Sequence, residues 1–169
     1  MARAELKILI GLHRAVNDLD RRTAQLAAAA GLTLGQFAVL EALYHKGDLT
    51  VGQVQEAILS SSGTIPLIVG KLEQRGLLTR RQDGADRRRF ILSLTEAGRA
   101  QIAALYPRNE EMIVRQMECW SAAEQQTLAA LLRRFGDREG ACPPRAGRGR
   151  AETRTSSATD AARPQKGSI

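Results

Sequence analysis

The segment from Ser60 to Gly98 reads S-S-S-G-T-I-P-L-I-V-G-K-L-E-Q-R-G-L-L-T-R-R-Q-D-G-A-D-R-R-R-F-I-L-S-L-T-E-A-G. Its pattern predicts a helix, a β-hairpin and the start of another helix. The first helix is indicated by apolar residues at helical spacing, namely Ile65, Ile68, Val69 and Leu72. Pro66 is tolerated only near a helix start, which places the N-cap near Ser61 or Ser62. Gly76 then predicts the end of this helix.

The hairpin is predicted from two short strands and a turn. Leu78 to Arg81 can form the first strand, and Asp83-Gly84 is a turn signal. From Phe90 to Leu94 apolar and polar residues alternate, with one exception at Ile91, which predicts the second strand. Thr95 is placed to cap the next helix, with an acidic residue in its first turn.

This segment is also strongly basic. Between Lys71 and Arg99 there are eight lysines and arginines against four acidic residues. The cations include Lys71 and Arg75 on the helix and Arg87, Arg88 and Arg89 at the hairpin tip. The helix start is small and polar, so that it can approach a groove closely, and consists of Ser60, Ser61, Ser62, Gly63 and Thr64. These features are typical of a nucleic-acid surface, although a solvated, Arg-rich turn would give the same composition.

The order of residues within the segment is more specific than its charge. The run L-x-x-R-G-L-L-x-R-x-x-x-x-x-D-x-R-x-x-x-x-x-L-T-x-x-G, from Leu72 to Gly98, resembles the signature of the MarR family of bacterial winged-helix transcription regulators. The resemblance covers about Glu5 to Phe135. It implies a mainly α fold with a small β-hairpin wing, in which a winged helix-turn-helix DNA-binding lobe joins a helical dimerisation lobe.

The resemblance also implies an obligate homodimer and particular roles for two residues of the wing. In the family, the wing inserts an arginine into the minor groove and an aspartate orients it. The matching positions here are Arg88 and Asp86. The chemistry is reasonable, because a narrow minor groove concentrates negative potential and attracts arginine.

Composition and length place the chain among globular proteins of one ordinary domain. It has 169 residues, of which 43% are apolar and 25% charged, and its net charge is +7. No apolar run approaches the roughly 18 residues that would span a bilayer. Charged residues interrupt the N-terminal apolar stretch, so it does not resemble a secretory signal. Two cysteines, Cys119 and Cys142, do not make a disulfide scaffold. A cytoplasmic location is the simplest interpretation.

The chain before the central segment predicts three helices. Met1 to Ala30 reads as one long helix with a wide apolar face, from which we infer a subunit contact; packing within one chain is the alternative. Thr33-x-x-Gln36 and Thr50-x-x-Gln53 are capping-box matches that open two shorter helices. With the helix that follows, these give helix-turn-helix geometry.

Two further helices are predicted after the hairpin. One runs from Gly98 to about Cys119, and Pro107 should kink or break it by removing a backbone hydrogen bond. Cys119 is expected to be a buried helix residue rather than a redox sensor. The last helix opens at the capping-box match Ser121-x-x-Glu124 and stops at Gly136.

These elements suggest a division of the chain into a folded part and a tail. Residues 1–139 are expected to form the winged-helix domain, with dimerisation helices at about 4–30 and 96–136 and the DNA-binding lobe at about 33–95. Residues 140–169 contain no aromatic residue and no large aliphatic residue except Ile169. Such a segment cannot bury enough apolar surface to offset its ordering entropy, so a disordered, basic tail is predicted.

Three classes of function can be weighed from these patterns. The sequence favours a dimeric regulator, in which a repressor binds a pseudo-palindromic operator of double-stranded DNA and a small phenolic or aromatic effector releases it. A low-specificity architectural DNA-binding protein is the alternative. No enzyme motif is found, and His13 and His45 lack ligand-spaced partners, so neither catalysis, a metal nor a cofactor is expected. An effector crevice between the lobes is predicted at His13, Asn17, Tyr44 and Leu105, although core packing explains Tyr44 and Leu105 as well.

Overall fold

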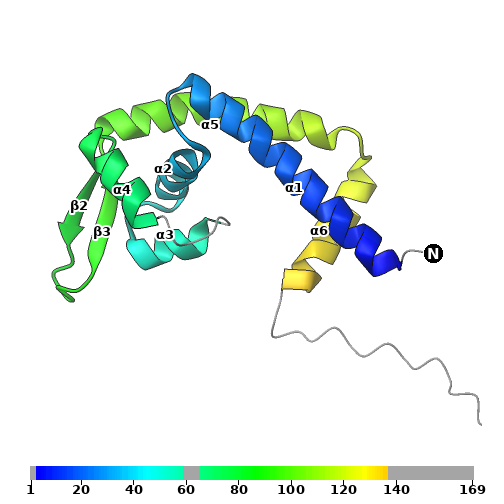
Figure 1. Cartoon of the computed structure of the whole chain (residues 1–169), viewed down its shortest axis with the longest axis horizontal. Coiled ribbons are helices and arrows are strands. Elements are labelled where there is room, and N and C mark those ends of the chain that lie inside the picture. Colours follow the sequence, from blue (N-terminus) through cyan, green and yellow to red (C-terminus); the bar gives the residue numbers. More distant parts are fainter. Residues whose placement is uncertain (1–2, 59–64, 137–169) are drawn as a thin grey trace, which may run out of the picture. The chain divides into compact units, whose positions relative to one another are not determined.

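The computed structural model describes residues 3–58 and 65–136 (Figure 1). The helices are α1 (Ala4–Ala29), α2 (Leu34–Lys46), α3 (Val51–Ala57), α4 (Ile65–Gln74), α5 (Glu96–Met117) and α6 (Ala122–Gly136). The strands are β1 (Leu49–Thr50), β2 (Leu78–Gln82) and β3 (Phe90–Leu94). The chain divides into two compact units, Met1–Ser121 and Ala122–Ile169, and α6 is the described element of the second. The predicted fold class, mainly helical with a small antiparallel hairpin, is confirmed.

Both of the predicted capping boxes before the hairpin are present. At the start of α2, Gln36 N donates to Thr33 Oγ1 at 3.2 Å, and Thr33 N donates to Gln36 Oε1 at 2.9 Å. At the start of α3, Gln53 N donates to Thr50 Oγ1 at 3.2 Å, and Thr50 N donates to Gln53 Oε1 at 2.8 Å. Each box satisfies two backbone donors that the first helical turn would otherwise leave unpaired. The sequence therefore fixes the starts of these two helices locally.

The sheet has one strand more than the sequence predicted. Strands β2 and β3 pair antiparallel as the expected hairpin, with Leu78 opposite Leu94 and Gln82 opposite Phe90. The additional strand, β1, pairs with the other edge of β3 and gives the order β1-β3-β2. Because β1 has only two residues, it is too short for an alternation of apolar and polar residues to predict it. Its pairing ties the α2–α3 connection to the hairpin.

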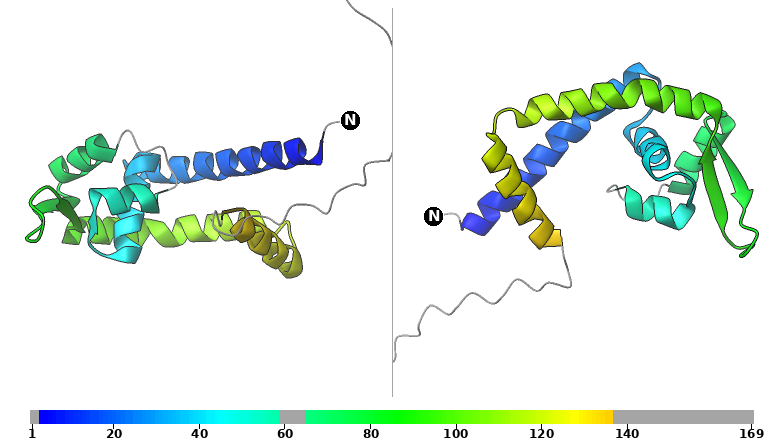
Figure 2. Two further views of the ribbon diagram at one scale, coloured as in Figure 1. Left: turned by 90° about the horizontal axis from the view of Figure 1, so that it is seen from below. Right: turned by 180° about the vertical axis from the view of Figure 1, so that it is seen from behind.

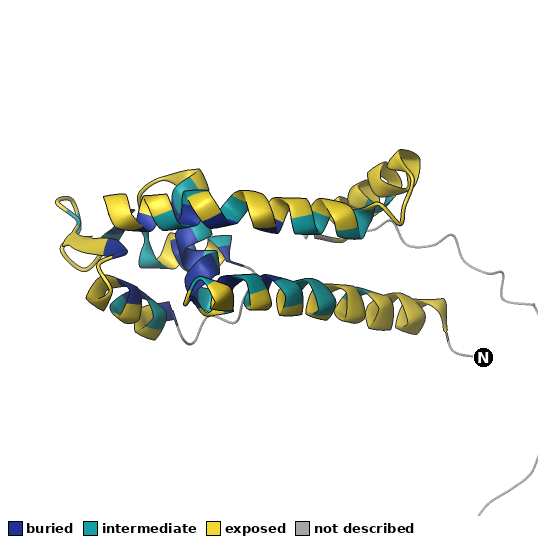
Figure 3. Ribbon diagram, turned by 90° about the horizontal axis from the view of Figure 1, so that it is seen from above, coloured by how far each residue is buried: buried dark blue, intermediate teal, exposed yellow. Residues whose placement is uncertain are grey.

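Helix α2 forms the centre of the core. Its side chains Phe37, Val39, Leu40 and Leu43 are buried, and Figure 3 shows that burial concentrates in this helix and where its neighbours meet it. The other elements contribute apolar residues to the same cluster, among them Ala27, Val54, Val69, Leu72, Leu92, Ile102 and Leu105. A helix buried on most sides is stabilised chiefly by this packing rather than by its own propensity.

Helix α5 is continuous from Glu96 to Met117 and includes Pro107. Pro107 therefore does not break the helix, which was one of the two effects predicted for it, and the kink stays a prediction. Pro107 is exposed, whereas Ile102, Leu105 and Asn109 on either side of it are buried. Losing one backbone hydrogen bond at the proline costs less free energy than exposing these buried side chains would. The packing of both halves of α5 therefore keeps the helix continuous.

At the junction between the hairpin and α5, hydrogen bonds and a close backbone contact hold the two elements together. Thr95 Oγ1 accepts from Gly98 N at 3.0 Å and donates to the carbonyl of Gly76 at 2.7 Å. A Cβ added at Gly98 would overlap the carbonyl oxygen of Leu77 and lie 2.8 Å from its carbonyl carbon. The threonine and glycine at the end of the Leu72–Gly98 motif therefore hold the base of the hairpin against the start of α5.

The C-terminal half of α1 packs on α5, while its N-terminal half is exposed (Figures 2 and 3). A buried hydrogen bond of 2.9 Å from Thr23 Oγ1 to Asn109 Oδ1 joins the two helices. Asp18 pairs with Arg21 and Arg22 on its own helix and accepts a hydrogen bond of 3.3 Å from Gln116. The hydrogen bonds from Arg22 and then Arg21 lower the pKa of Asp18. These polar contacts fix the angle at which α1 leaves the core.

Cys119 lies beyond the end of α5 and is exposed. The prediction of a buried helix residue is therefore wrong. Its thiol donates to the carbonyl of Gln116 at 3.3 Å. The helix ends two residues earlier than expected, and this shift moves the side chain away from the packed face.

No helix in the described ranges is by itself long and apolar enough to cross a bilayer. Helices α1 and α2, bent by 87° relative to each other, pass that test only as a pair and only by length and composition.

Candidate nucleic-acid interface and effector cavity

The β2–β3 hairpin projects beyond the neighbouring helices, with its loop at the free end (Figure 1). Its tip carries three adjacent exposed arginines, Arg87, Arg88 and Arg89. Local hydrogen bonds shape the loop: Asp83 N donates to the carbonyl of Arg89 at 3.0 Å, and Gln82 Nε2 donates to the carbonyl of Arg87 at 2.7 Å. These contacts give a highly charged loop a defined backbone, so that its side chains start from fixed positions.

Asp86 organises the loop through two contacts. Its Oδ1 accepts a hydrogen bond of 3.0 Å from the backbone N of Arg88, and its Oδ2 pairs with Arg89 Nε at 3.3 Å. The orientation of the Arg88 guanidinium by Asp86 in a DNA groove stays a prediction. An Asx turn fixes the backbone at Arg88, and the ion pair is made one residue later.

Helix α4 presents its cations beside the hairpin in two different ways. Lys71 is exposed on the helix, whereas Arg75 Nη1 donates to the carbonyl of Gly31 at 2.8 Å. Arg75 therefore satisfies a carbonyl at the end of α1. The predicted polar helix start lies outside the described residues and comprises Ser60, Ser61, Ser62, Gly63 and Thr64.

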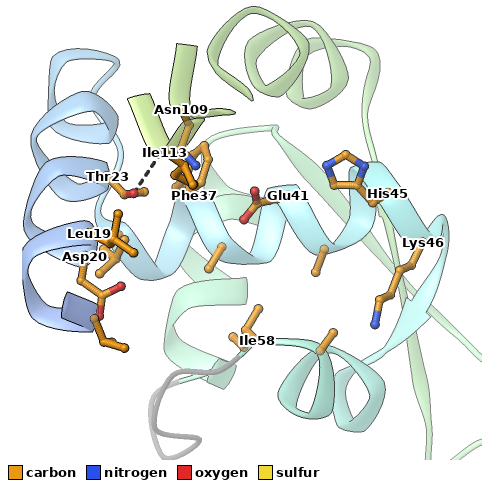
Figure 4. A pocket seen from close by; sticks show the side chains of 15 residues that line it. Leu19, Asp20, Thr23, Phe37, Glu41, His45, Lys46, Ile58, Asn109 and Ile113 are labelled. Atoms are coloured by element: carbon orange, nitrogen blue, oxygen red, sulfur yellow. Dashed lines mark hydrogen bonds between the residues drawn. The ribbon is translucent and has the colours of Figure 1, made fainter. Parts of the chain in front are cut away.

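A cavity of about 680 Å³ lies between α1, α2, α3 and α5 (Figure 4). Most of its wall is apolar and includes Leu19, Phe37 and Ile58. Its polar lining consists of Asp20, Thr23, Glu41, His45, Lys46 and Asn109. An apolar chamber with a few convergent polar groups is the usual form of a small-molecule site.

None of the four predicted effector residues lines this cavity. His13 and Asn17 are exposed on α1, Tyr44 is half-buried, and Leu105 is buried in the core. Their assignment to a ligand stays a prediction. A signal in the sequence did point to one cavity residue: Glu41 is a carboxylate within the otherwise apolar run of α2, four residues after Phe37.

Glu41 is half-buried on the cavity wall. This burial raises the pKa of its carboxyl above the ordinary value of 4.5, and the nearby His45 acts in the opposite direction. His45 itself packs edge-on against Tyr106, with their ring centroids 4.4 Å apart. The cavity therefore contains a carboxylate that is partly removed from water.

Replacing Glu41 by glutamine is expected to raise the melting temperature at about pH 7. Because burial raises the folded-state pKa of Glu41, the fold favours the protonated carboxyl group. The stability that this group contributes is complete below its unfolded-state pKa and is lost as the pH rises through the folded-state pKa, so at pH 7 the ionised carboxylate no longer contributes it. Glutamine cannot ionise, so the advantage of Glu41→Gln should shrink toward about pH 4. Thermal melts across this range give the measurement. Glu110→Gln, at an exposed position on α5, is the control and should show no such trend.

Comparison with known proteins agrees with this geometry. The MarR family model matches residues 32–90. The HTH-type transcriptional regulator MhqR of Bacillus subtilis is 35% identical over 136 residues, covering 80% of this chain and 94% of that protein. A structure that concerns regulation of DNA binding of Bordetella bronchiseptica BpsR by 6-hydroxynicotinic acid superposes with a TM-score of 0.70. It is 29% identical and covers 78% of this chain and 99% of that one.

A second solved structure supports the fold alone. NadR in complex with 4-hydroxyphenylacetate is 23% identical, with a TM-score of 0.65 over 76% of this chain and 91% of that one. MhqR is a transcriptional regulator, and the BpsR structure concerns a DNA-binding protein. The basic wing, the helices before it and the identity with these proteins lead to one conclusion: the chain belongs to the MarR family of DNA-binding transcriptional regulators.

Proposed function

We propose that this protein is a dimeric repressor that binds a pseudo-palindromic operator and releases it when a small phenolic or aromatic molecule enters the cavity. The observation that carries the proposal is the set of helices that form the cavity wall. Its lining comes from α2 and the end of α3, which lead to α4, and also from α1 and α5. A ligand in the cavity would contact the helices that lead to α4 and also α1 and α5. It would therefore favour the relative position of these helices that fits it best.

The proposed DNA contacts come from α4 and the hairpin. Helix α4 follows α3 as the second part of a helix-turn-helix and would enter the major groove, with Lys71 reaching a phosphate. Ser60–Thr64, which are outside the described residues, are proposed to contact DNA as well. The wing would place Arg88 in the adjacent minor groove, with Arg87 and Arg89 beside the backbone. The contact between Arg75 and Gly31 favours a structural role for that arginine, which would support the helix indirectly.

Arg88→Ala is expected to weaken operator binding by roughly 1–3 kcal/mol, on the scale of one good groove contact. Asp86→Ala should also weaken it, because the variant loses the bond to Arg88 N and the ion pair with Arg89. Charge counting alone predicts tighter binding. Affinities are compared at one salt concentration on operator and random duplexes.

The control for this pair is Asp83→Ala, which removes the same charge from the same loop. The Asp83 carboxylate accepts a hydrogen bond of 3.0 Å from Ala85 N, whereas the ion pair with Arg89 is made by Asp86. If Asp86→Ala and Asp83→Ala both tightened operator binding, the wing would act only as a diffuse basic patch.

The dimer is proposed to form through the exposed apolar residues of the N-terminal half of α1. These residues are Leu6, Ile8, Leu9, Ile10 and Val16. Helix α6, described by itself, also exposes Leu131, Leu132 and Phe135. Exposed apolar surface on this scale is typical of an interface between subunits. We propose residues 1–139 as the operative domain and 140–169, which lie beyond the described residues, as a basic tail.

The direct test is binding to the DNA upstream of the protein's own gene. A discrete footprint with two-fold symmetry, released by a phenolic compound, supports the ligand-responsive repressor. Uniform coverage of the duplex would instead favour an architectural protein that binds through its wing and tail, with affinity set by phosphate contacts and steeply dependent on salt. In either case we propose that the protein acts in the cytoplasm.

A further inference from the structure

The charged groups of the cavity are distributed unevenly. Asp20 from α1 and Glu41 from α2 are carboxylates, and Lys46 at the end of α2 is the cation among the described lining residues. Arginine is absent from that described lining. Figure 4 shows Glu41 between the Thr23–Asn109 pair on one side and His45 and Lys46 on the other. The two acidic groups come from helices on different walls, so that a bound ligand would face both.

Burial decides which of these charged groups interacts most strongly with a bound ligand. Asp20 on α1 and Lys46 in the last turn of α2 are both exposed, so water and salt screen their charges. Glu41 is half-buried, so its carboxylate acts through a medium of lower effective dielectric constant. A ligand carboxylate in the chamber would lose its own hydration and would meet a negative charge. A ligand ammonium group would meet a carboxylate that lacks full hydration.

The polar pair near Glu41 suits an uncharged hydroxyl. Thr23 is 8% exposed and Asn109 is 3% exposed, and both line the cavity. Their mutual hydrogen bond joins α1 to α5. A hydroxyl group both donates and accepts, so it can join such a pair without adding a charge.

We propose that the cavity takes aromatic ligands that are uncharged or cationic and rejects aromatic carboxylates, with Glu41 as the specificity-determining residue. The proposal rests on the cavity being the effector site of the proposed function. It separates this chain from two of its structural neighbours, because the ligands named for BpsR and NadR are both aromatic carboxylic acids. In this chain the described wall holds two carboxylates, of which Glu41 is half-buried, one exposed lysine, and no guanidinium group with which to pair such a ligand.

The test uses three probes that share a 4-hydroxyphenyl ring and are close in size. Tyramine carries an ammonium group, 4-(2-hydroxyethyl)phenol is neutral, and 4-hydroxyphenylacetate carries a carboxylate. Titration calorimetry on the full-length protein gives each Kd, and operator release is measured with the same three compounds. The wild-type protein is expected to bind tyramine at least about tenfold more tightly than 4-hydroxyphenylacetate, as one like-charge contact of this kind would require.

Glu41→Gln should reduce the tyramine-to-hydroxyphenylacetate ratio by about tenfold, while the Kd of the neutral probe changes by less than about threefold. Glu110→Gln, which removes an exposed carboxylate of α5 outside the cavity, should leave the ratio unchanged. Thermal melts check that both variants are folded. Loss of charge discrimination only in Glu41→Gln supports the proposal.

Two results would overturn the proposal while leaving the proposed function intact. One is tightest binding and operator release by 4-hydroxyphenylacetate, and the other is an unchanged ratio in Glu41→Gln. A third result, in which none of the probes binds, would overturn both the proposal and the role of the cavity as an effector site. Operator binding in the absence of any probe distinguishes these cases from a failure of the DNA-binding assignment.

Discussion

The double variant Leu6→Glu, Ile10→Glu is expected to be monomeric and to bind operator DNA about a hundredfold or more weakly than the parent chain. Leu6 and Ile10 are 52% and 50% exposed on α1, one turn apart. Two buried carboxylates would make a subunit interface strongly unfavourable, because a charge without a partner is costly to desolvate. A monomer would engage one half-site and would lose the effective concentration that links the two halves.

Light scattering at micromolar concentration measures the oligomeric state, and circular dichroism checks the fold. The DNA-binding core should survive, because its buried cluster draws on α1 only near Ala27. The double variant Lys7→Gln, Arg14→Gln is the matched control, since it lowers the charge of α1 by the same two units without touching an apolar position. A folded dimer of the Leu6→Glu, Ile10→Glu variant would show that the subunit contact lies elsewhere.

Gly98→Ala is expected to lower the free energy of unfolding by about 3 kcal/mol, the upper range for steric overpacking. The added methyl group would overlap the Leu77 carbonyl, which is backbone and cannot rotate away. Relief would require the hairpin base and the start of α5 to move apart, and the hydrogen bonds of Thr95 to Gly76 and Gly98 would be strained. Operator binding should weaken as well, because the wing is attached at this junction.

Urea unfolding monitored by circular dichroism measures the stability change. Gly70→Ala is the control, since a Cβ at that helical position meets nothing within 4 Å. It should stabilise the protein by up to about 1 kcal/mol, through the higher helix propensity of alanine. If Gly98→Ala were as stable as Gly70→Ala, the close approach at this junction would not be a real constraint.

Local chemistry allowed much of the fold to be predicted from the sequence. The capping boxes at Thr33 and Thr50 depend on contacts three residues apart, so the residues themselves specify them. The glycines that end helices follow the same logic: Gly31, Gly47 and Gly76 all have positive φ angles. The hairpin could be predicted because its turn signal and alternation lie within one short segment.

Features that depend on distant residues were missed or predicted wrongly. Of the kink or break predicted at Pro107, the break did not occur, because tertiary packing on both sides of the proline stabilises α5. Strand β1 forms because Leu49 and Thr50 pair with the edge of β3. Two residues are too few to show an alternating pattern in the sequence. A local feature was missed as well: Asp86 pairs with Arg89, three residues along the chain, because of the geometry of the loop.

The sequence by itself therefore determined the approximate positions of the helices, the caps at Thr33, Thr50 and Thr95, the basic hairpin and the family, because these depend on residues that lie close together along the chain. The cavity could be decided only by the tertiary structure. Asp20, Glu41 and Asn109 lie on three separate helices, and no spacing along the chain indicates that they share one chamber. Burial of one of these carboxylates, and with it the charge of the ligand that the chamber accepts, arises from packing between helices.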